Sequence, residues 1–222
     1  MLTRMWVPQS VFMTKRIGYG SRKGIVPRTT TTTTTMNPIE TMKTIGANLL
    51  IKQNSSNTWT NSVFRDINEL KPDHAGKVGE LFTLQLCNSA DVACDYNENI
   101  NSKDGTYDIL ILDKKVEIKT ARIGIHGGFQ HETLKAEGYD YLLFVDITPD
   151  SFYLTVLPKF DMKIKHSIIG RTPHPRKGTS DVFKFDFALA NLERAVTAGC
   201  SLKVGPDTSM ADIGEFIRRT IV

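Results

Sequence analysis

The stretch that decides the fold prediction is residues 108–119, which read Asp-Ile-Leu-Ile-Leu-Asp-Lys-Lys-Val-Glu-Ile-Lys. An apolar run, a short polar segment and an alternating segment follow one another, which predicts two strands joined by a tight turn. Side chains alternate between the two faces of a strand, so Glu117 and Lys119 share one face. Val116 and Ile118 are expected to point the other way, into a core.

Acidic residues stand at the ends of these predicted strands. If Asp108 lies beside the paired strand, its carboxylate meets Glu117, and the Lys119 ammonium lies nearby. Two carboxylates and an ammonium at a sheet edge can hold a divalent cation and orient a water, which suits phosphodiester cleavage. The apolar run 109–112 predicts a strand buried on both faces, where an acid without a partner is destabilising. The alternatives are a strand-end cap for Asp108 and a solvated strand face for Glu117 and Lys119.

Composition places the chain among globular proteins of ordinary size. It has 222 residues, of which 40% are hydrophobic and 23% charged, and its net charge is +4. This charge is compatible with a nucleic-acid partner. No apolar run reaches the roughly 18 residues of a membrane span, so no membrane partner is expected. Cys87, Cys94 and Cys200 form no C-x-x-C motif, which argues against zinc and disulfides and favours reduced thiols in an intracellular protein.

The N-terminal segment differs from the rest of the chain. No acid occurs before Glu40, and Thr29 to Thr35 is an unbroken threonine run. We expect residues 1–40 to be a disordered basic arm. A transit peptide, or a true start at Met36 or Met42, are the other interpretations.

Residues 41–222 are predicted to form a single α/β domain with a catalytic core at about 76–157. The expected core elements are a helix at 76–88, a strand at 92–96, a loop at 97–105, the two strands of 108–119, a helix at 129–137 and a strand at 139–147. These elements give the order αβββαβ, with a mixed central sheet flanked by helices. Further elements are expected at 41–51 and 62–70 (helices), 151–157 and 180–187 (strands), and 187–198 and 210–219 (helices).

This pattern resembles the PD-(D/E)XK nuclease superfamily, whose fold is restriction-endonuclease-like. Asp108 followed by Glu117-Ile118-Lys119 resembles the family signature D-(x)n-E-x-K, although Tyr107 stands where the family name has proline. The resemblance implies that Asp108, Glu117 and the Ile118 carbonyl bind Mg²⁺, for which Mn²⁺ is expected to substitute. It also implies that Lys119 positions the attacking water.

The same resemblance assigns roles to two residues outside the signature. Glu80, on the preceding helix, would be a further metal-binding and catalytic acid. Gln130, on the following helix, would lie near the active site and contact DNA. The simpler interpretation of both is a surface position on a helix.

Basic residues downstream are candidates for DNA binding. Lysine and arginine neutralise phosphates, and arginine also reads guanine edges. The candidates are Lys165, Arg171, Arg176 and Lys177, together with Arg122 after the second strand. The alternative is a solvated surface loop. We expect residues 158–222 to contact DNA and to form a dimer interface.

The leading hypothesis is a Mg²⁺-dependent endonuclease of double-stranded DNA that resembles a type II restriction enzyme and acts as a homodimer. Two alternatives remain at this point. One is a structure-specific nuclease that acts on Holliday junctions or in repair. The other is a non-catalytic DNA-binding protein with the same fold.

Overall fold

The computed structural model describes residues 59–96, 107–179 and 181–222, all within one compact unit, Leu49–Val222. The expected arm at 1–40, the helix at 41–51 and the loop at 97–105 lie outside the described residues. The helices are α2 (Arg65–Glu69), α3 (Pro72–Ser89), α5 (Leu189–Thr197) and α6 (Met210–Thr220). The strands are β1 (Cys94–Asp95), β2 (Ile109–Ile111), β3 (Lys114–Arg122), β4 (Gly128–Lys135), β5 (Tyr141–Ile147), β6 (Phe152–Pro158), β7 (His174–Pro175), β8 (Val182–Ala188) and β9 (Ser201–Val204).

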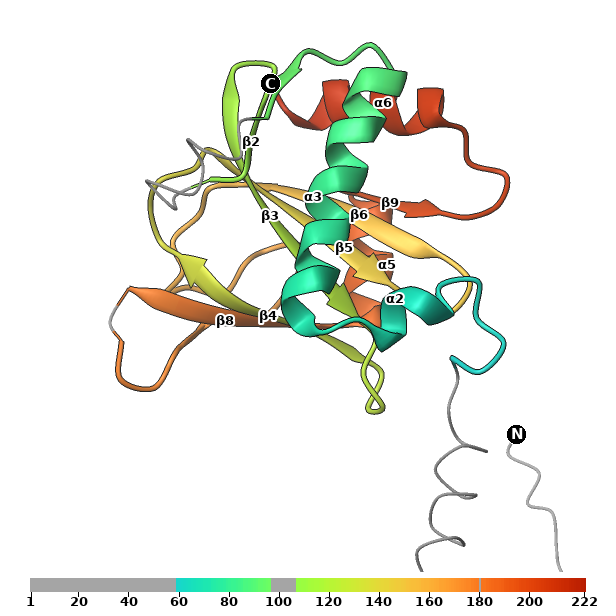
Figure 1. Cartoon of the computed structure of the whole chain (residues 1–222). Coiled ribbons are helices and arrows are strands. Elements are labelled where there is room, and N and C mark those ends of the chain that lie inside the picture. The colour runs from blue at the N-terminus through green and yellow to red at the C-terminus, as the bar shows by residue number, and fades with distance from the viewer. Residues whose placement is uncertain (1–58, 97–106, 180) are drawn as a thin grey trace, which may run out of the picture. The chain divides into compact units, whose positions relative to one another are not determined.

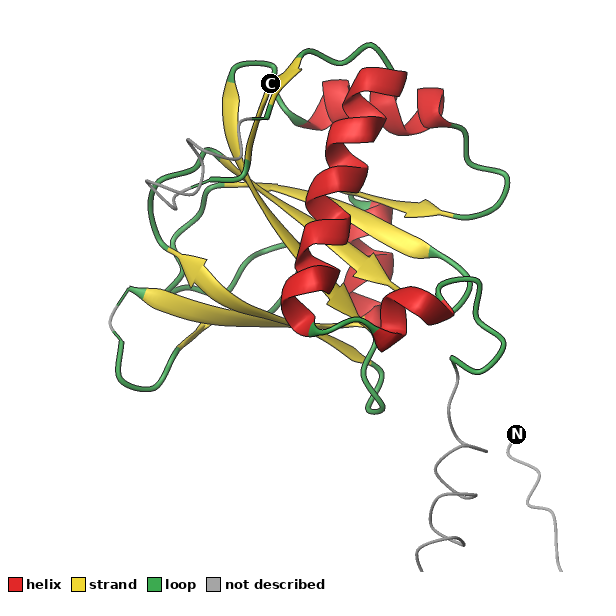
Figure 2. Cartoon of the chain, viewed as in Figure 1, coloured by secondary structure: helices red, strands yellow, loops and turns green. Residues whose placement is uncertain are grey.

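The described strands form two sheets, as Figure 1 and Figure 2 show. The main sheet has the order β1-β2-β3-β5-β6-β9, and the smaller sheet has the order β4-β8-β7. In the main sheet β3 and β5 are parallel, and every other neighbouring pair is antiparallel. All residues of β5 are buried, as expected for a strand covered on both faces. The prediction of a mixed α/β fold with a mixed sheet is confirmed.

Each face of the main sheet contributes to a separate hydrophobic cluster. On one face, Val116 and Ile118 pack with residues of α3 and α6, among them Leu86 and Phe216. Helix α3 crosses this face, with α6 beside it (Figure 1). The other cluster joins side chains of β5 to α5 and to the aromatic face of β8: Leu142, Phe144, Phe183, Phe185, Phe187, Leu192 and Ala195.

The predicted helix at 129–137 is wrong, because this segment is strand β4. It pairs with β8, and the connection from β3 to the parallel strand β5 therefore runs through the smaller sheet. A bulge between His131 and Leu134, with Thr133 at φ 59°, interrupts the alternation of the strand. The described order thus departs from αβββαβ, since a strand stands where the second helix was expected.

Residues 109–112 are not a strand buried on both faces. Strand β2 ends at Ile111, and Leu110 is only half-buried between the buried Ile109 and Ile111. Leu112 and Asp113 form the hairpin turn with φ of 50° and 63°. Two left-handed residues in succession are typical of a type I′ turn, which matches the twist of the flanking strands.

The C-terminal part is integral to the fold and is not an appended module. Strand β9 extends the main sheet beside β6, and β8 supplies the aromatic face of the smaller sheet. Helix α5 ends before Gly199, whose φ of 78° fits the expected C-terminal cap. Among the residues that the structure describes, no helix has the length and apolar character needed to span a membrane.

Helix α3 approaches β3 closely at Gly79, and this contact sets the position of the neighbouring Glu80. A Cβ atom at Gly79 would lie 2.0 Å from the Thr120 hydroxyl oxygen. At Gly76, on the same helix, a Cβ atom would meet nothing within 4 Å. Of these two glycines, only Gly79 is therefore required by the packing of α3 against β3.

We predict that Gly79→Ala destabilises the protein by about 1–3 kcal/mol, because it pushes α3 away from β3. Gly76→Ala is the matched control and should stabilise by roughly 0.5–1 kcal/mol through helix propensity. Urea unfolding followed by circular dichroism measures both changes. Equal effects of the two substitutions would contradict the close approach at Gly79.

Candidate active site on strands β2 and β3

The site is built on the hairpin of β2 and β3, where the ladder between the two strands ends. The Asp108 amide donates a hydrogen bond to the Val116 carbonyl at 3.0 Å. One residue pair further, the Ile118 amide donates to the Asp108 carboxylate at 2.7 Å, so a side chain takes the place of a main-chain acceptor. Because Ile118 lies between Glu117 and Lys119, this bond holds the Asp108 carboxylate beside both.

The predicted division of β3 between two faces is confirmed. Val116 and Ile118 are buried in the cluster under α3. Glu117 and Lys119 form an ion pair in which Oε1 and Nζ are 2.6 Å apart. Their side chains are 11% and 20% exposed, so both charges are largely removed from water yet still reach it. Because water has limited access to the two groups, their mutual attraction is screened less than that of an exposed surface pair.

Burial and the charge of Glu117 together raise the pKa of Asp108 to about 7. The Ile118 hydrogen bond and the Lys119 charge oppose this shift, and the charge of Glu80 adds to it. Burial, and secondly the charge of Glu117, also raise the pKa of the Tyr139 phenol far above its ordinary value. The Tyr139 hydroxyl is buried without a hydrogen-bond partner. A bound cation would favour the ionised form of the Asp108 carboxyl, which burial and the charge of Glu117 disfavour.

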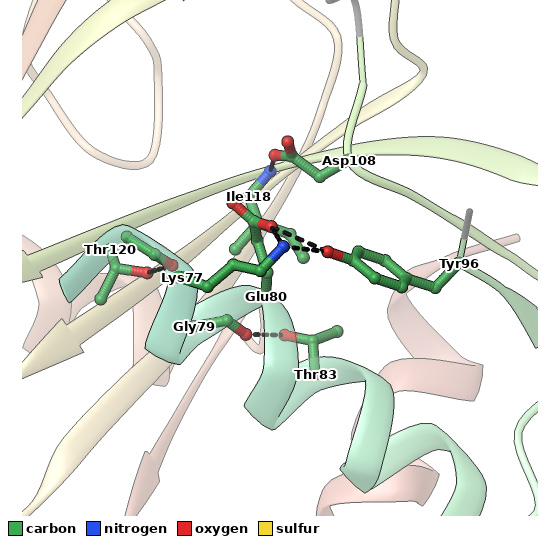
Figure 3. A network of polar contacts seen from close by, with 9 residues as sticks. Lys77, Gly79, Glu80, Thr83, Tyr96, Asp108, Ile118 and Thr120 are labelled. Atoms are coloured by element: carbon green, nitrogen blue, oxygen red, sulfur yellow. Dashed lines mark hydrogen bonds and ion pairs between the residues drawn. The ribbon is translucent and has the colours of Figure 1, made fainter. Parts of the chain in front are cut away.

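Glu80 is contributed by α3 and belongs to a network of three side chains, shown in Figure 3. Its Oε2 atom is 3.2 Å from Lys77 Nζ and also accepts a hydrogen bond of 3.2 Å from the Tyr96 hydroxyl. Lys77 in turn donates to the Tyr96 hydroxyl, and its ammonium lies 5.1 Å from the centre of the Tyr96 ring. Glu80 is thus near Asp108 but is bound to its own partners.

These residues fit a magnesium site of the kind that uses few protein ligands. In the described part of the chain, no three His, Cys, Asp or Glu side chains are arranged to hold a metal ion. Mg²⁺ commonly binds one or two carboxylates and keeps several waters, which Asp108 and Glu117 can satisfy. The N–H and C=O of a strand residue point to the same side, so the Ile118 carbonyl faces the same edge as Asp108. Asp108, Glu117 and the Ile118 carbonyl can therefore serve as such a ligand set, and whether they and Glu80 bind a metal stays a prediction.

Two residues predicted to bind DNA have other positions. Gln130 lies on strand β4, not on a helix, and its exposed side chain points away from the buried face that carries Phe129 and His131. Arg122 Nη1 donates to the main-chain carbonyls of Ile67, Asn68 and Leu70 at 2.9, 2.6 and 2.9 Å. The guanidinium therefore caps the end of α2, and we leave Arg122 out of the proposed interface. A DNA contact by the exposed Gln130 stays a prediction.

The remaining basic candidates are all exposed: Lys165, Arg171, Arg176 and Lys177. Arg176 and Lys177 lie between β7 and β8, at the end of the smaller sheet. Exposure leaves them able to contact a phosphate backbone, and whether they do stays a prediction.

The sequence prediction missed Lys77, Tyr96 and Tyr139 as members of the site. Lys77 could have been found, because it is three residues before Glu80 on a predicted helix and i,i+3 pairs meet. The sequence gives no signal for the two tyrosines, because each reaches the site through tertiary contacts. Tyr96 contacts Lys77 and Glu80 on α3, and Tyr139 comes near Glu117 through the pairing of β3 with β5.

Comparison of the chain with protein-family models, with curated proteins and with solved structures found no match.

We predict that Asp108→Asn stabilises the metal-free protein at neutral pH. In the folded state this carboxyl has a pKa of about 7, whereas in the unfolded chain it ionises near pH 4. The folded state therefore binds the extra proton, and wild-type stability falls as the pH rises between these values. The variant lacks that fall, so its advantage should grow through this window to about 4 kcal/mol above pH 7, at roughly 1.36 kcal/mol for each pKa unit.

Urea unfolding in EDTA at pH 5 and pH 8 measures the effect. Asp181→Asn, at an exposed aspartate, is the control and should change stability equally at both pH values. A pH-independent effect of Asp108→Asn would show that Asp108 ionises normally.

Proposed function

We propose that this protein is a Mg²⁺-dependent endonuclease that hydrolyses phosphodiester bonds in double-stranded DNA. The observation that carries the proposal is the convergence of Asp108, Glu117 and Lys119 on one hairpin. Two carboxylates are close enough for Glu117 to help raise the pKa of Asp108 to about 7, and an ammonium lies 2.6 Å from one of them. The D-(x)n-E-x-K resemblance supports the same conclusion.

Each group has a distinct part in this proposal. Asp108, Glu117 and the Ile118 carbonyl would hold Mg²⁺, which supplies charge neutralisation at the phosphate and a more acidic water. Lys119 would donate a hydrogen bond to the attacking water or to a phosphate oxygen, where negative charge develops. Its position is fixed by β3, and its partial burial strengthens the interaction with an anion.

The surface charge supports a nucleic-acid substrate. The chain has a net charge of +4, and its exposed cations include Arg176 and Lys177 on one loop. Such residues add affinity that does not depend on sequence and position the duplex for cleavage.

We predict that Glu117→Gln and Lys119→Met each lower the rate of DNA cleavage by about 10²–10³-fold, through loss of a metal ligand and of a charge-stabilising donor. The assay uses supercoiled plasmid, linear duplex, a four-way junction and a single-stranded RNA, with Mg²⁺ or Mn²⁺. Glu193→Gln and Lys203→Met remove the same groups at exposed positions and should leave the rate unchanged.

The choice among substrates also separates the alternatives. Preference for the junction would replace a duplex endonuclease with a structure-specific nuclease. Absence of cleavage on every substrate, or cleavage that both active-site variants retain, would overturn the proposal.

We predict that the double substitution of Arg176 and Lys177 by alanine weakens DNA binding by about tenfold near 0.1 M salt. The plot of log K against log salt should become shallower, with the magnitude of its negative slope smaller by about 2. The reason is that each lost phosphate contact removes about 0.9 from that magnitude. Fluorescence anisotropy with duplex DNA in EDTA measures both. The control substitutes Lys203 and Arg219 by alanine, which removes the same charge from β9 and α6. Equal slopes for the two double variants would place the interface elsewhere.

A further inference from the structure

The carboxylate of Glu80 already has a cation bound to it. Lys77 Nζ and the Tyr96 hydroxyl both lie 3.2 Å from the same oxygen, Oε2. The two side chains of the ion pair are only 34% and 25% exposed. Lys77 is in turn held by the Tyr96 hydroxyl and ring, so the ammonium is fixed from two elements, α3 and the residue after β1 (Figure 3). This is more than an exposed i,i+3 pair on a helix surface.

The charges around the site are balanced in pairs. Lys77 faces Glu80, and Lys119 faces Glu117. Asp108 experiences the charges of Glu117, Lys119 and Glu80, so each of these three groups lies within electrostatic range of Asp108. A divalent cation that enters here competes with the ammonium groups for carboxylate oxygens, because both bind the same lone pairs.

We propose that Lys77, positioned by Tyr96, is the counter-ion of Glu80 in the metal-free protein and must release Glu80 when a divalent cation binds. This inference rests on the proposed function, since it concerns the same metal site. It makes Lys77 a positioning residue that sets metal affinity, and it explains why the described side chains hold no pre-formed three-carboxylate cluster. Glu80 becomes available to the metal, directly or through a water, only after the exchange.

The test is titration of the DNA-free protein with Mn²⁺ by isothermal calorimetry. Lys77→Met should tighten Mn²⁺ binding about fivefold, and Tyr96→Phe should tighten it less, because the ammonium remains. Adding Glu80→Gln to Lys77→Met should abolish the gain, because the contested ligand is gone. Lys71→Met is the matched control: it removes one positive charge at the start of α3, roughly 13 Å along the axis from Glu80.

The outcomes separate this inference from the proposed function. If the wild type binds Mn²⁺ and Lys77→Met binds no more tightly than Lys71→Met, the inference is wrong and the metal site stands. If neither the wild type nor Lys77→Met binds Mn²⁺, both the proposed metal site and this inference are wrong. Binding by Lys77→Met alone would support the inference in its strongest form. Thermal unfolding of each variant verifies that the fold is retained.

Discussion

The parallel pairing of β3 with β5 is the constraint on which the rest of the structure depends. The register runs from Val116 opposite Tyr141 to Arg122 opposite Ile147. Strand β5 is buried along its whole length, so helices must cover one face and the smaller sheet with α5 the other. This register sets Glu117 beside Leu142 and Lys119 beside Phe144. A charged pair is thereby held on a strand that pairs with β5 on one side and lies just beyond the end of β2 on the other. The positions of the two residues along β3 are fixed by main-chain hydrogen bonds and not by side-chain rotamers alone.

The elements that could be predicted from the sequence are those whose signals are local. The turn and the alternating residues 114–119 after it form a pattern of about a dozen residues, which can be recognised without any distant contact. This pattern predicts which side chains lie on each face of β3. Helix α3, strand β5 and helix α6 were predicted for the same reason, since each has its full periodic pattern within the element. The meeting of Asp108 with Glu117 was also predictable, because a tight hairpin fixes which residues lie opposite one another.

The failures come from contacts between distant segments. Strand β4 contains good helix formers, and its bulge at Thr133 spaces the buried residues as Phe129, His131 and Leu134, which hides the period of two. What makes it a strand is its partner β8, more than fifty residues later, whose phenylalanines require an apolar face opposite. Gln130 was predicted to lie on a helix and lies on strand β4 instead. Arg122 donates to a main-chain carbonyl of α2, a contact that its neighbours in the sequence do not indicate.

Burial of an ionisable pair by itself does not mark a functional site, as a second pair in the same fold shows. His131 and Asp146 lie 3.0 Å apart with both side chains fully buried, and His131 contacts the rings of Phe144 and Phe187. This pair joins β4 to β5 and has no access to a ligand. Glu117 and Lys119 differ because 11% and 20% of their side-chain surface remains exposed. Replacing a buried ion pair by apolar residues of similar volume is often neutral or stabilising. Stability alone therefore does not account for the buried charges where the β2–β3 ladder ends, whereas the proposed reaction would account for them.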